Sequence, residues 1–102
     1  MPGINFTALR AQVSLEDVLR LLNFQPVRRR GPKLRGACPL CRSSYPRAFA
    51  ADLSTNRYCC FSCGRKGNQL ELWAAMRSLS FHAGALDLCH NLGIEAPLIQ
   101  RW

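Results

Sequence analysis

The sequence predicts a small α+β domain in which a short antiparallel sheet, of about three strands, is preceded by one helix and followed by two. Two observations carry this prediction. Apolar residues recur with a helical period near both ends of the chain, and short strand-like runs lie between and beside two Cys-x-x-Cys pairs. With 102 residues, 48% of them hydrophobic and 20% charged, we expect one ordered domain spanning residues 1–102.

The N-terminal helix is predicted between Ser14 and Leu22. Ser14 can accept a hydrogen bond from a free amide of the first turn, and the acidic pair Glu16 and Asp17 suits the positive end of the helix dipole. The apolar residues follow the i, i+3, i+4, i+7 pattern of a single buried stripe, Leu15, Val18, Leu19 and Leu22.

The middle of the chain alternates turns with short strands. Glycine and proline interrupt the basic stretch 28–36, so we expect a loop that leads into a short strand near Leu34. Residues 47–52 and 57–60 are predicted as two strands joined by a turn at 54–56, where serine, threonine and asparagine favour chain reversal.

Two helices are expected after the strands. Asn68 can cap the first of them, and Glu71, three residues later, can complete a capping box. Trp73 has apolar neighbours and is predicted to lie in the core. The second helix is expected from about Ser80 to Gly93, because glycine commonly ends a helix.

The paired cysteines predict a metal site. Cys38-Pro39-Leu40-Cys41 and Cys60-Phe61-Ser62-Cys63 share one spacing, and eighteen residues separate the pairs. Two residues between cysteines allow one tight turn to present both sulfurs to one ion, and two such turns supply the four thiolates of a closed tetrahedral zinc site. We therefore predict a zinc ribbon with one structural Zn²⁺, whose full shell has no place for a catalytic water.

Cysteines also serve in disulfides, in redox catalysis and in iron–sulfur clusters. Disulfides require an oxidising compartment, and the N-terminus resembles no export signal. Redox catalysis usually needs one reactive Cys-x-x-Cys rather than two matched pairs. An iron–sulfur cluster uses the same four thiolates, and this alternative stays open at the level of sequence.

Two cysteines and both histidines fall outside the pattern. Cys59 directly precedes a ligand in a strand, so its side chain should point to the opposite face. Cys89 lies among apolar helical residues and is predicted to be a small core side chain. His82 and His90 are expected on the helix surface.

The positive charge is concentrated around the metal ligands. The formal net charge is +8, and ten of the fourteen Lys and Arg residues lie between residues 28 and 66, with Asp52 as the one acid there. Such a local field favours a polyanion, most plausibly nucleic acid, over a merely solubilising surface. For Arg28-Arg29-Arg30 we favour a flexible phosphate-binding arm over a solvated loop.

The sequence also indicates the cellular compartment. No stretch approaches the roughly 20 apolar residues that a membrane helix needs. We expect a cytoplasmic protein without membrane contact, in which thiols stay reduced and available to a metal.

The segment Tyr58–Asn68, with its Cys-Phe-Ser-Cys-Gly turn followed by a helix, resembles the zinc-binding domain of DnaG-type bacterial and phage DNA primases. The resemblance runs from about Val13 to Pro97, which makes residues 98–102 a tail. That family usually has histidine as its second ligand, where this chain has Cys41; the shell remains complete. The residue before the third ligand is often histidine there and is Cys59 here.

The resemblance implies a non-catalytic module that engages single-stranded template DNA. Primer synthesis in that family uses clustered acids that hold Mg²⁺ in a separate domain, whereas the six acids here are dispersed. A basic sheet with aromatic side chains can hold a strand by phosphate contacts and base stacking. The candidate phosphate ligands are Arg35, Arg47, Arg57, Arg65 and Lys66. The candidate stacking residues are Tyr45, Phe49, Tyr58 and Phe61; for Phe49 and Phe61 the alternative is packing beneath the sheet or over the zinc turn.

The sequence is also compatible with two other functions. One is a protein–protein adaptor that docks to a polymerase, helicase or mobile-element protein, with Leu98–Trp102 as a docking tail. The other is a regulator that binds duplex DNA. Single-stranded DNA binding is the favoured interpretation.

Overall fold

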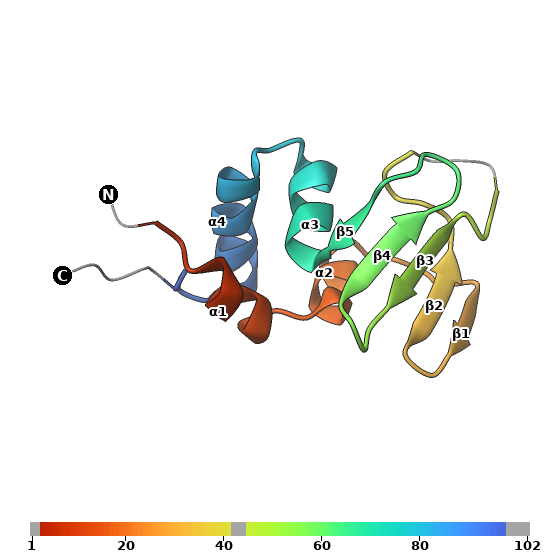
Figure 1. The fold of residues 1–102 in the computed structure, drawn as a ribbon, viewed down its shortest axis with the longest axis horizontal. Helices are drawn as coiled ribbons and strands as arrows, with labels where there is room; N and C mark the ends of the chain where they lie inside the picture. Colours follow the sequence, from red (N-terminus) through yellow and green to blue (C-terminus); the bar gives the residue numbers. More distant parts are fainter. Residues whose placement is uncertain (1–2, 42–44, 98–102) are drawn as a thin grey trace.

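Helices gather at one end of the molecule and a five-stranded sheet at the other (Figure 1). The computed structural model describes residues 3–41 and 45–97, so the predicted docking tail lies outside the described residues. The helices are α1 (Phe6–Gln12), α2 (Leu15–Leu21), α3 (Gln69–Arg77) and α4 (Phe81–Leu92). The strands are β1 (Arg28–Arg30), β2 (Lys33–Gly36), β3 (Phe49–Asp52), β4 (Arg57–Cys60) and β5 (Lys66–Asn68).

The sheet is an antiparallel meander in the order β1-β2-β3-β4-β5. The predicted antiparallel sheet is confirmed, but it has five strands instead of about three. The prediction of a flexible arm at Arg28–Arg30 is wrong, because these residues form edge strand β1 and pair with β2. A tight turn at Gly31, whose φ is +59°, allows the chain to reverse there.

The pairing register assigns each strand residue to one face of the sheet. Side chains directly opposite one another share a face. One face carries two transverse rows, which we call the open face: Arg28, Arg35, Ala50, Cys59 and Lys66 in the first row, and Arg30, Lys33, Asp52, Arg57 and Asn68 in the second. The alternate residues point to the opposite face, where Leu34, Phe49, Ala51, Tyr58 and Cys60 are buried.

Helix α2 packs behind that buried face. Its predicted cap is confirmed: the Ser14 hydroxyl accepts from the Asp17 amide at 3.1 Å, and the Asp17 carboxylate accepts from the Ser14 amide at 3.2 Å. Arg29 reaches back from β1 to within 3.8 Å of the carboxylate of Glu16 in α2. The middle arginine of β1 is therefore directed away from the open face.

The C-terminal helices follow the predicted pattern. Asn68 and Glu71 form the expected capping box of α3, and Gly93 ends α4 with a φ of +69°. Trp73 is 4% exposed, and its indole N–H donates to Asp87 at 2.9 Å, so its predicted core position is confirmed. Helix α1 was not predicted, because it is seven residues long and Leu9 is its one buried residue.

Helices α3 and α4 pack closely at Gly84. A Cβ atom built there would lie 2.6 Å from the Ala74 Cβ and 2.8 Å from the Ala74 Cα. We expect Gly84→Ala to lower the free energy of unfolding by about 1–2 kcal/mol, because overpacking outweighs the gain in helix propensity. Urea denaturation of the zinc-loaded protein measures this loss. His90→Ala, on the exposed side of the same helix, is the control and should change stability little.

Candidate metal centre and nucleic-acid interface

The sheet topology brings the two cysteine turns together. Strands β2 and β4 run in the same direction, since each is antiparallel to β3 between them. The Cys38–Cys41 turn follows β2, and the Cys60–Cys63 turn begins at the last residue of β4. Both turns therefore lie at one end of the sheet, and the four Sγ atoms lie within 4.8 Å of one another.

The arrangement of the four sulfurs fits one Zn²⁺. A tetrahedron with Zn–S bonds of about 2.3 Å has S–S edges of about 3.8 Å; the Cys41 and Cys60 sulfurs are 3.6 Å apart. The amides of Ser62 and Cys63 each donate to the Cys60 sulfur at 3.3 Å, as a thiolate ligand requires. Gly64, with a φ of +78°, closes the turn by donating its amide to the Cys60 carbonyl at 2.9 Å.

The protein environment shifts the pKa values of Cys38 and Cys60 in opposite directions. Burial raises the pKa of Cys38 to about 12. Burial also opposes ionisation of Cys60, but the hydrogen bonds that its sulfur accepts, chiefly from the amides of Cys63 and Ser62, outweigh burial and lower the pKa of that thiol to about 6. A divalent cation supplies the charge that four neighbouring thiolates need in order to coexist. The predicted role of this quartet as the site of one structural zinc ion is confirmed in its geometry.

The remaining cysteines and the histidines lie where the sequence predicts. Cys59 points to the open face, opposite to its neighbour Cys60. Cys89 is 3% exposed in the core. Both His82 and His90 are exposed on α4.

The open face carries strong positive charge with almost no acid to neutralise it. Among its ten residues are six cations, namely Arg28, Arg30, Lys33, Arg35, Arg57 and Lys66, and the single acid Asp52. That carboxylate accepts from the amide of Ser54 at 3.0 Å and from its hydroxyl at 2.5 Å, and these bonds lower its pKa. Asp52 is therefore held by the β3–β4 turn, and within the described residues it forms no ion pair with the cations beside it.

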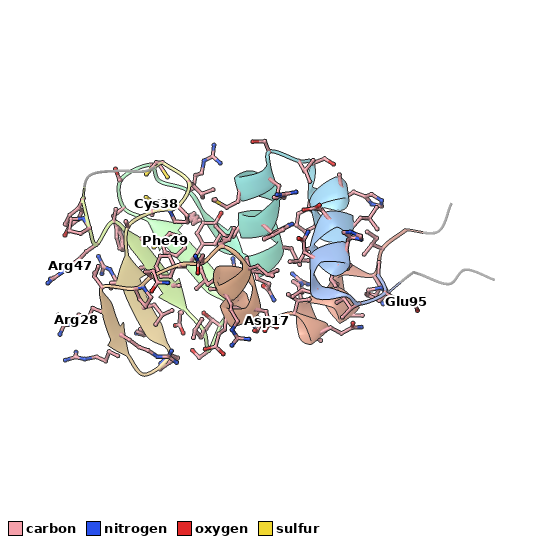
Figure 2. All side chains as sticks on the ribbon, turned by 180° about the vertical axis from the view of Figure 1, so that it is seen from behind. Asp17, Arg28, Cys38, Arg47, Phe49 and Glu95 are labelled. Carbon is pink, nitrogen blue, oxygen red and sulfur yellow. The ribbon has the colours of Figure 1, made fainter. Side chains whose placement is uncertain are left out.

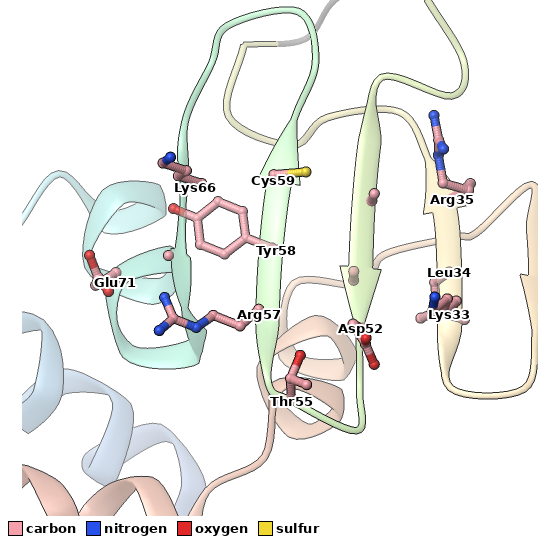
Figure 3. Close-up of a pocket in the computed structure, with 13 residues that line it drawn as sticks. Lys33, Leu34, Arg35, Asp52, Thr55, Arg57, Tyr58, Cys59, Lys66 and Glu71 are labelled. Atoms are coloured by element: carbon pink, nitrogen blue, oxygen red, sulfur yellow. The ribbon is translucent and has the colours of Figure 1, made fainter.

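A hollow of about 680 Å³ runs over this face (Figure 3). The small residues Ala50 and Cys59 occupy the middle of the first row and leave room between the longer side chains. Lys33 and Arg35 line one side, and Arg57 and Lys66 line the other. This trough is lined by four cations and by two carboxylates, those of Asp52 and Glu71, so its positive charge exceeds its negative charge by two.

The predicted phosphate ligands divide into two groups. Arg35, Arg57 and Lys66 share the open face, whereas Arg47 and Arg65 are exposed in loops beside the zinc turns. In Figure 2, Arg28 and Arg47 project from the sheet end of the molecule. Arg35 also has a structural contact: its guanidinium donates to the Arg47 carbonyl at 2.7 Å and lies 4.9 Å from the centre of the Phe61 ring.

Two of the candidate stacking residues are buried, and Phe49 takes the alternative position expected for it, beneath the sheet. Phe49 is fully buried and Tyr58 is 5% exposed, and their rings stack on each other at 5.6 Å beneath the sheet. The register places both on the buried face, where the Phe24 ring packs against Phe49. Phe61 and Tyr45 remain accessible, with 63% and 52% exposed. Phe61 does not pack over the zinc turn; its ring lies against Arg35.

The sequence reasoning missed Arg28, Arg30 and Lys33 as members of the same face. The sequence sign of this face was that every second residue on both sides of Gly31-Pro32 is basic. In a hairpin turning at Gly31-Pro32, residues 28 and 30 lie opposite residues 35 and 33. Three consecutive arginines resemble a solvated loop in sequence. Only their pairing with β2 shows that they form strand β1.

Within the described part of the chain, no helix has the length and apolar character needed to cross a membrane.

Comparisons with known proteins agree with this geometry. The DNA primase of Rickettsia typhi is 26% identical over 92 residues, which are 90% of this chain and 15% of that protein. The DNA primase of Rickettsia prowazekii is 27% identical over 89 residues, covering 87% of this chain and 14% of the relative. The chain therefore spans about one seventh of the length of these curated relatives.

A solved structure shares the fold. The crystal structure of the Aquifex aeolicus primase, described as its zinc-binding and RNA polymerase domains, superimposes with a TM-score of 0.73 at 23% identity. The match covers 93% of this chain and 23% of that chain. The family model of the CHC2 zinc finger, the zinc ribbon of DnaG, matches residues 4–101. With this match over nearly its whole length and four zinc ligands brought together at one end of its sheet, the chain belongs to the CHC2 zinc finger family of DnaG-type primases.

Proposed function

We propose that this chain is a non-catalytic nucleic-acid-binding module that holds single-stranded DNA across the open face of its sheet. The observation that carries the proposal is the charge of that face, where six cations stand in two rows and the one acid is held by a turn. Phosphates of a strand neutralise such a face and release counterions, which is the main source of sequence-independent affinity.

The aromatic residues favour a single strand over a duplex. Phe61 is exposed next to the end of the trough that Arg35 lines, and Tyr45 is exposed in the loop that precedes β3. Stacking on such rings requires unpaired bases, since a duplex keeps its bases stacked on each other. Zinc keeps Phe61 in place by fixing the turn between Cys60 and Cys63.

The relatives support the class of function. They are named DNA primases, and a primase works on template DNA; this chain matches only a small part of their length. Among the described residues, the four cysteines form the one group of three or more His, Cys, Asp or Glu side chains that can hold a metal. Clustered carboxylates for catalytic Mg²⁺ are not found within those residues, so we assign the chain a binding role beside a separate catalytic domain.

The test is fluorescence anisotropy with labelled single-stranded and duplex oligonucleotides over a salt series. We expect the single strand to bind more tightly, and log K to fall with log salt with a slope of about −4 if all six cations contact phosphates. A preference for duplex would favour the regulator, and no binding at low salt would refute the nucleic-acid proposal.

Strand β1 offers a matched pair of variants. Arg30→Gln removes a charge from the open face and should weaken single-strand binding about three- to fivefold at low salt. Arg29→Gln removes the same charge from the neighbouring residue, which faces α2, and should change binding less than twofold. Equal effects of the two variants would show that net charge, and not the open face, determines affinity.

A further inference from the structure

A second, smaller cavity lies beside the open face, where the N-terminus of α3 meets the β3–β4 turn and the end of α1. Its volume is about 250 Å³, and its lining is Arg10, Thr55, Asn56, Arg57, Asn68 and Gln69. We propose that this cavity is a phosphate-binding subsite that extends the path of a bound nucleotide chain beyond the sheet. The inference rests on the proposed function only for the identity of the larger ligand, because the cavity's preference for phosphate follows from its own lining.

The lining is rich in hydrogen-bond donors and contains no carboxylate. Arg10 and Arg57 are both exposed, and neither forms an ion pair within the described residues. Two arginines without acidic partners in the lining of one small cavity favour an anion. A phosphate group accepts from both through its several oxygens.

The two asparagine side chains in the lining still have donors available, because their oxygens are already used. The Asn56 side-chain oxygen already accepts from the Leu15 amide at 2.8 Å, and the Asn68 oxygen accepts from the amides of Leu70 and Glu71 at 3.0 Å each. Each side chain therefore retains its amide NH₂ as the group still available to a ligand, and neither NH₂ has a hydrogen bond recorded among the described residues. Asn68 also caps α3, whose N-terminus adds a positive end of a helix dipole.

Gln69 forms a fixed part of the cavity wall. It is 1% exposed, and its NH₂ donates to the carbonyls of Arg10 at 3.2 Å and Val13 at 2.7 Å, which fixes its orientation. Its oxygen is buried and has no hydrogen-bond partner among the described residues. A buried acceptor left unpaired is costly.

The cavity is continuous with the trough on the open face. Arg57 and Thr55 line both spaces, and Arg57 stands opposite Asn68 in the sheet register. Figure 3 shows Arg57 and Thr55 at the end of the trough near β5 and the β3–β4 turn. A strand that leaves the sheet along its second row therefore reaches Arg10 next.

The test uses zinc-loaded, ¹⁵N-labelled full-length chain, titrated separately with inorganic tripolyphosphate and with a ten-residue oligothymidylate. We expect the amide resonances of Thr55, Asn56 and Gln69 to shift with the oligonucleotide. A shift with tripolyphosphate as well would show that a free polyphosphate, such as that of a nucleotide, also fits; a shift with the oligonucleotide alone would assign the subsite to strand phosphates.

Arg10→Gln is the deciding variant. Arg10 lines the cavity, and the substitution retains its backbone carbonyl, which accepts from Gln69. We expect about fivefold weaker oligonucleotide binding at low salt, the loss of one charged contact. The control is Arg20→Gln, an exposed arginine in the last turn of the neighbouring short helix α2, which lies outside the cavity and pairs with Glu16 and Asp17; this variant should change binding less than twofold.

The two proposals fail in different ways. If the oligonucleotide binds but the cavity resonances do not move and both variants bind alike, the subsite is refuted and the open-face proposal stands. If the oligonucleotide does not bind while tripolyphosphate shifts the cavity resonances of the wild type and not of Arg10→Gln, the subsite stands without the function proposed for the sheet. If neither ligand shifts these resonances, the cavity is not a phosphate site.

Discussion

Removal of zinc should unfold the sheet. Structural zinc contributes about 10–16 kcal/mol in small zinc units, which equals or exceeds the whole stability of a typical domain, about 5–15 kcal/mol. The ion joins the ends of β2 and β4, and without it four thiols at one end of the sheet have no partner that holds them together. We expect chelation, or Cys38→Ser, to abolish slow amide exchange in β2, β3 and β4. Helices α3 and α4 pack on each other through a close contact at Gly84 and should persist longer.

The measurement is amide hydrogen exchange by NMR, together with metal analysis of the purified protein. Cys59→Ser is the matched control, because Cys59 is the neighbour of ligand Cys60 in the same strand and points to the open face. It should retain one zinc per chain and a protected sheet. A sheet that stays protected after complete zinc removal would contradict the assigned structural role, and iron in place of zinc would contradict the assigned metal.

Phe49 and Phe61 should show opposite effects when each is replaced by alanine. Phe49→Ala removes a fully buried ring that contacts Phe24 and Tyr58, and should lower the free energy of unfolding by about 3–5 kcal/mol. Phe61→Ala removes an exposed ring whose described contact is the guanidinium of Arg35, so its stability loss should stay below about 1 kcal/mol. Single-strand affinity should nevertheless fall about five- to a hundredfold, the usual cost of losing one base-stacking ring.

Urea denaturation and anisotropy on the same protein samples separate these effects. Phe49→Leu, which keeps much of the buried volume, is the control for Phe49→Ala and should lose less stability. If Phe61→Ala binds the single strand as tightly as the wild type, base stacking on the zinc turn is excluded. If Phe49→Ala weakened binding without loss of stability, the assignment of its ring to the core would be wrong.

Much of the fold was predictable because its signals are local. The caps formed by Ser14 with Asp17 and by Asn68 with Glu71 each join residues three apart, and the chain ends α4 at Gly93. In the same way, two residues between cysteines determine the shape of each zinc turn. Helix α1 and strand β5 escaped prediction because seven and three residues carry too little periodicity to be recognised.

The surface was harder to predict than the metal site, for a geometrical reason. A strand alternates its side chains between two faces, and nothing within the strand itself says which face is covered. Tyr58 and Arg57 are neighbours in sequence, yet Tyr58 is only 5% exposed, whereas Arg57 is exposed where it lines the trough. The sequence singled out both as ligands of DNA, and only one of them is accessible.

The sequence by itself determined the zinc ligands, the helix caps and the excess of positive charge, since each depends on residue types and short spacings along the chain. The tertiary structure alone decided where that charge is presented. The register of five strands put six cations on one face, turned Phe49 and Tyr58 beneath it, and brought Arg10 from α1 beside Arg57 from β4. These arrangements join residues up to 47 positions apart, as Arg10 and Arg57 are, and such distances are bridged only when the sheet pairs and the helices pack.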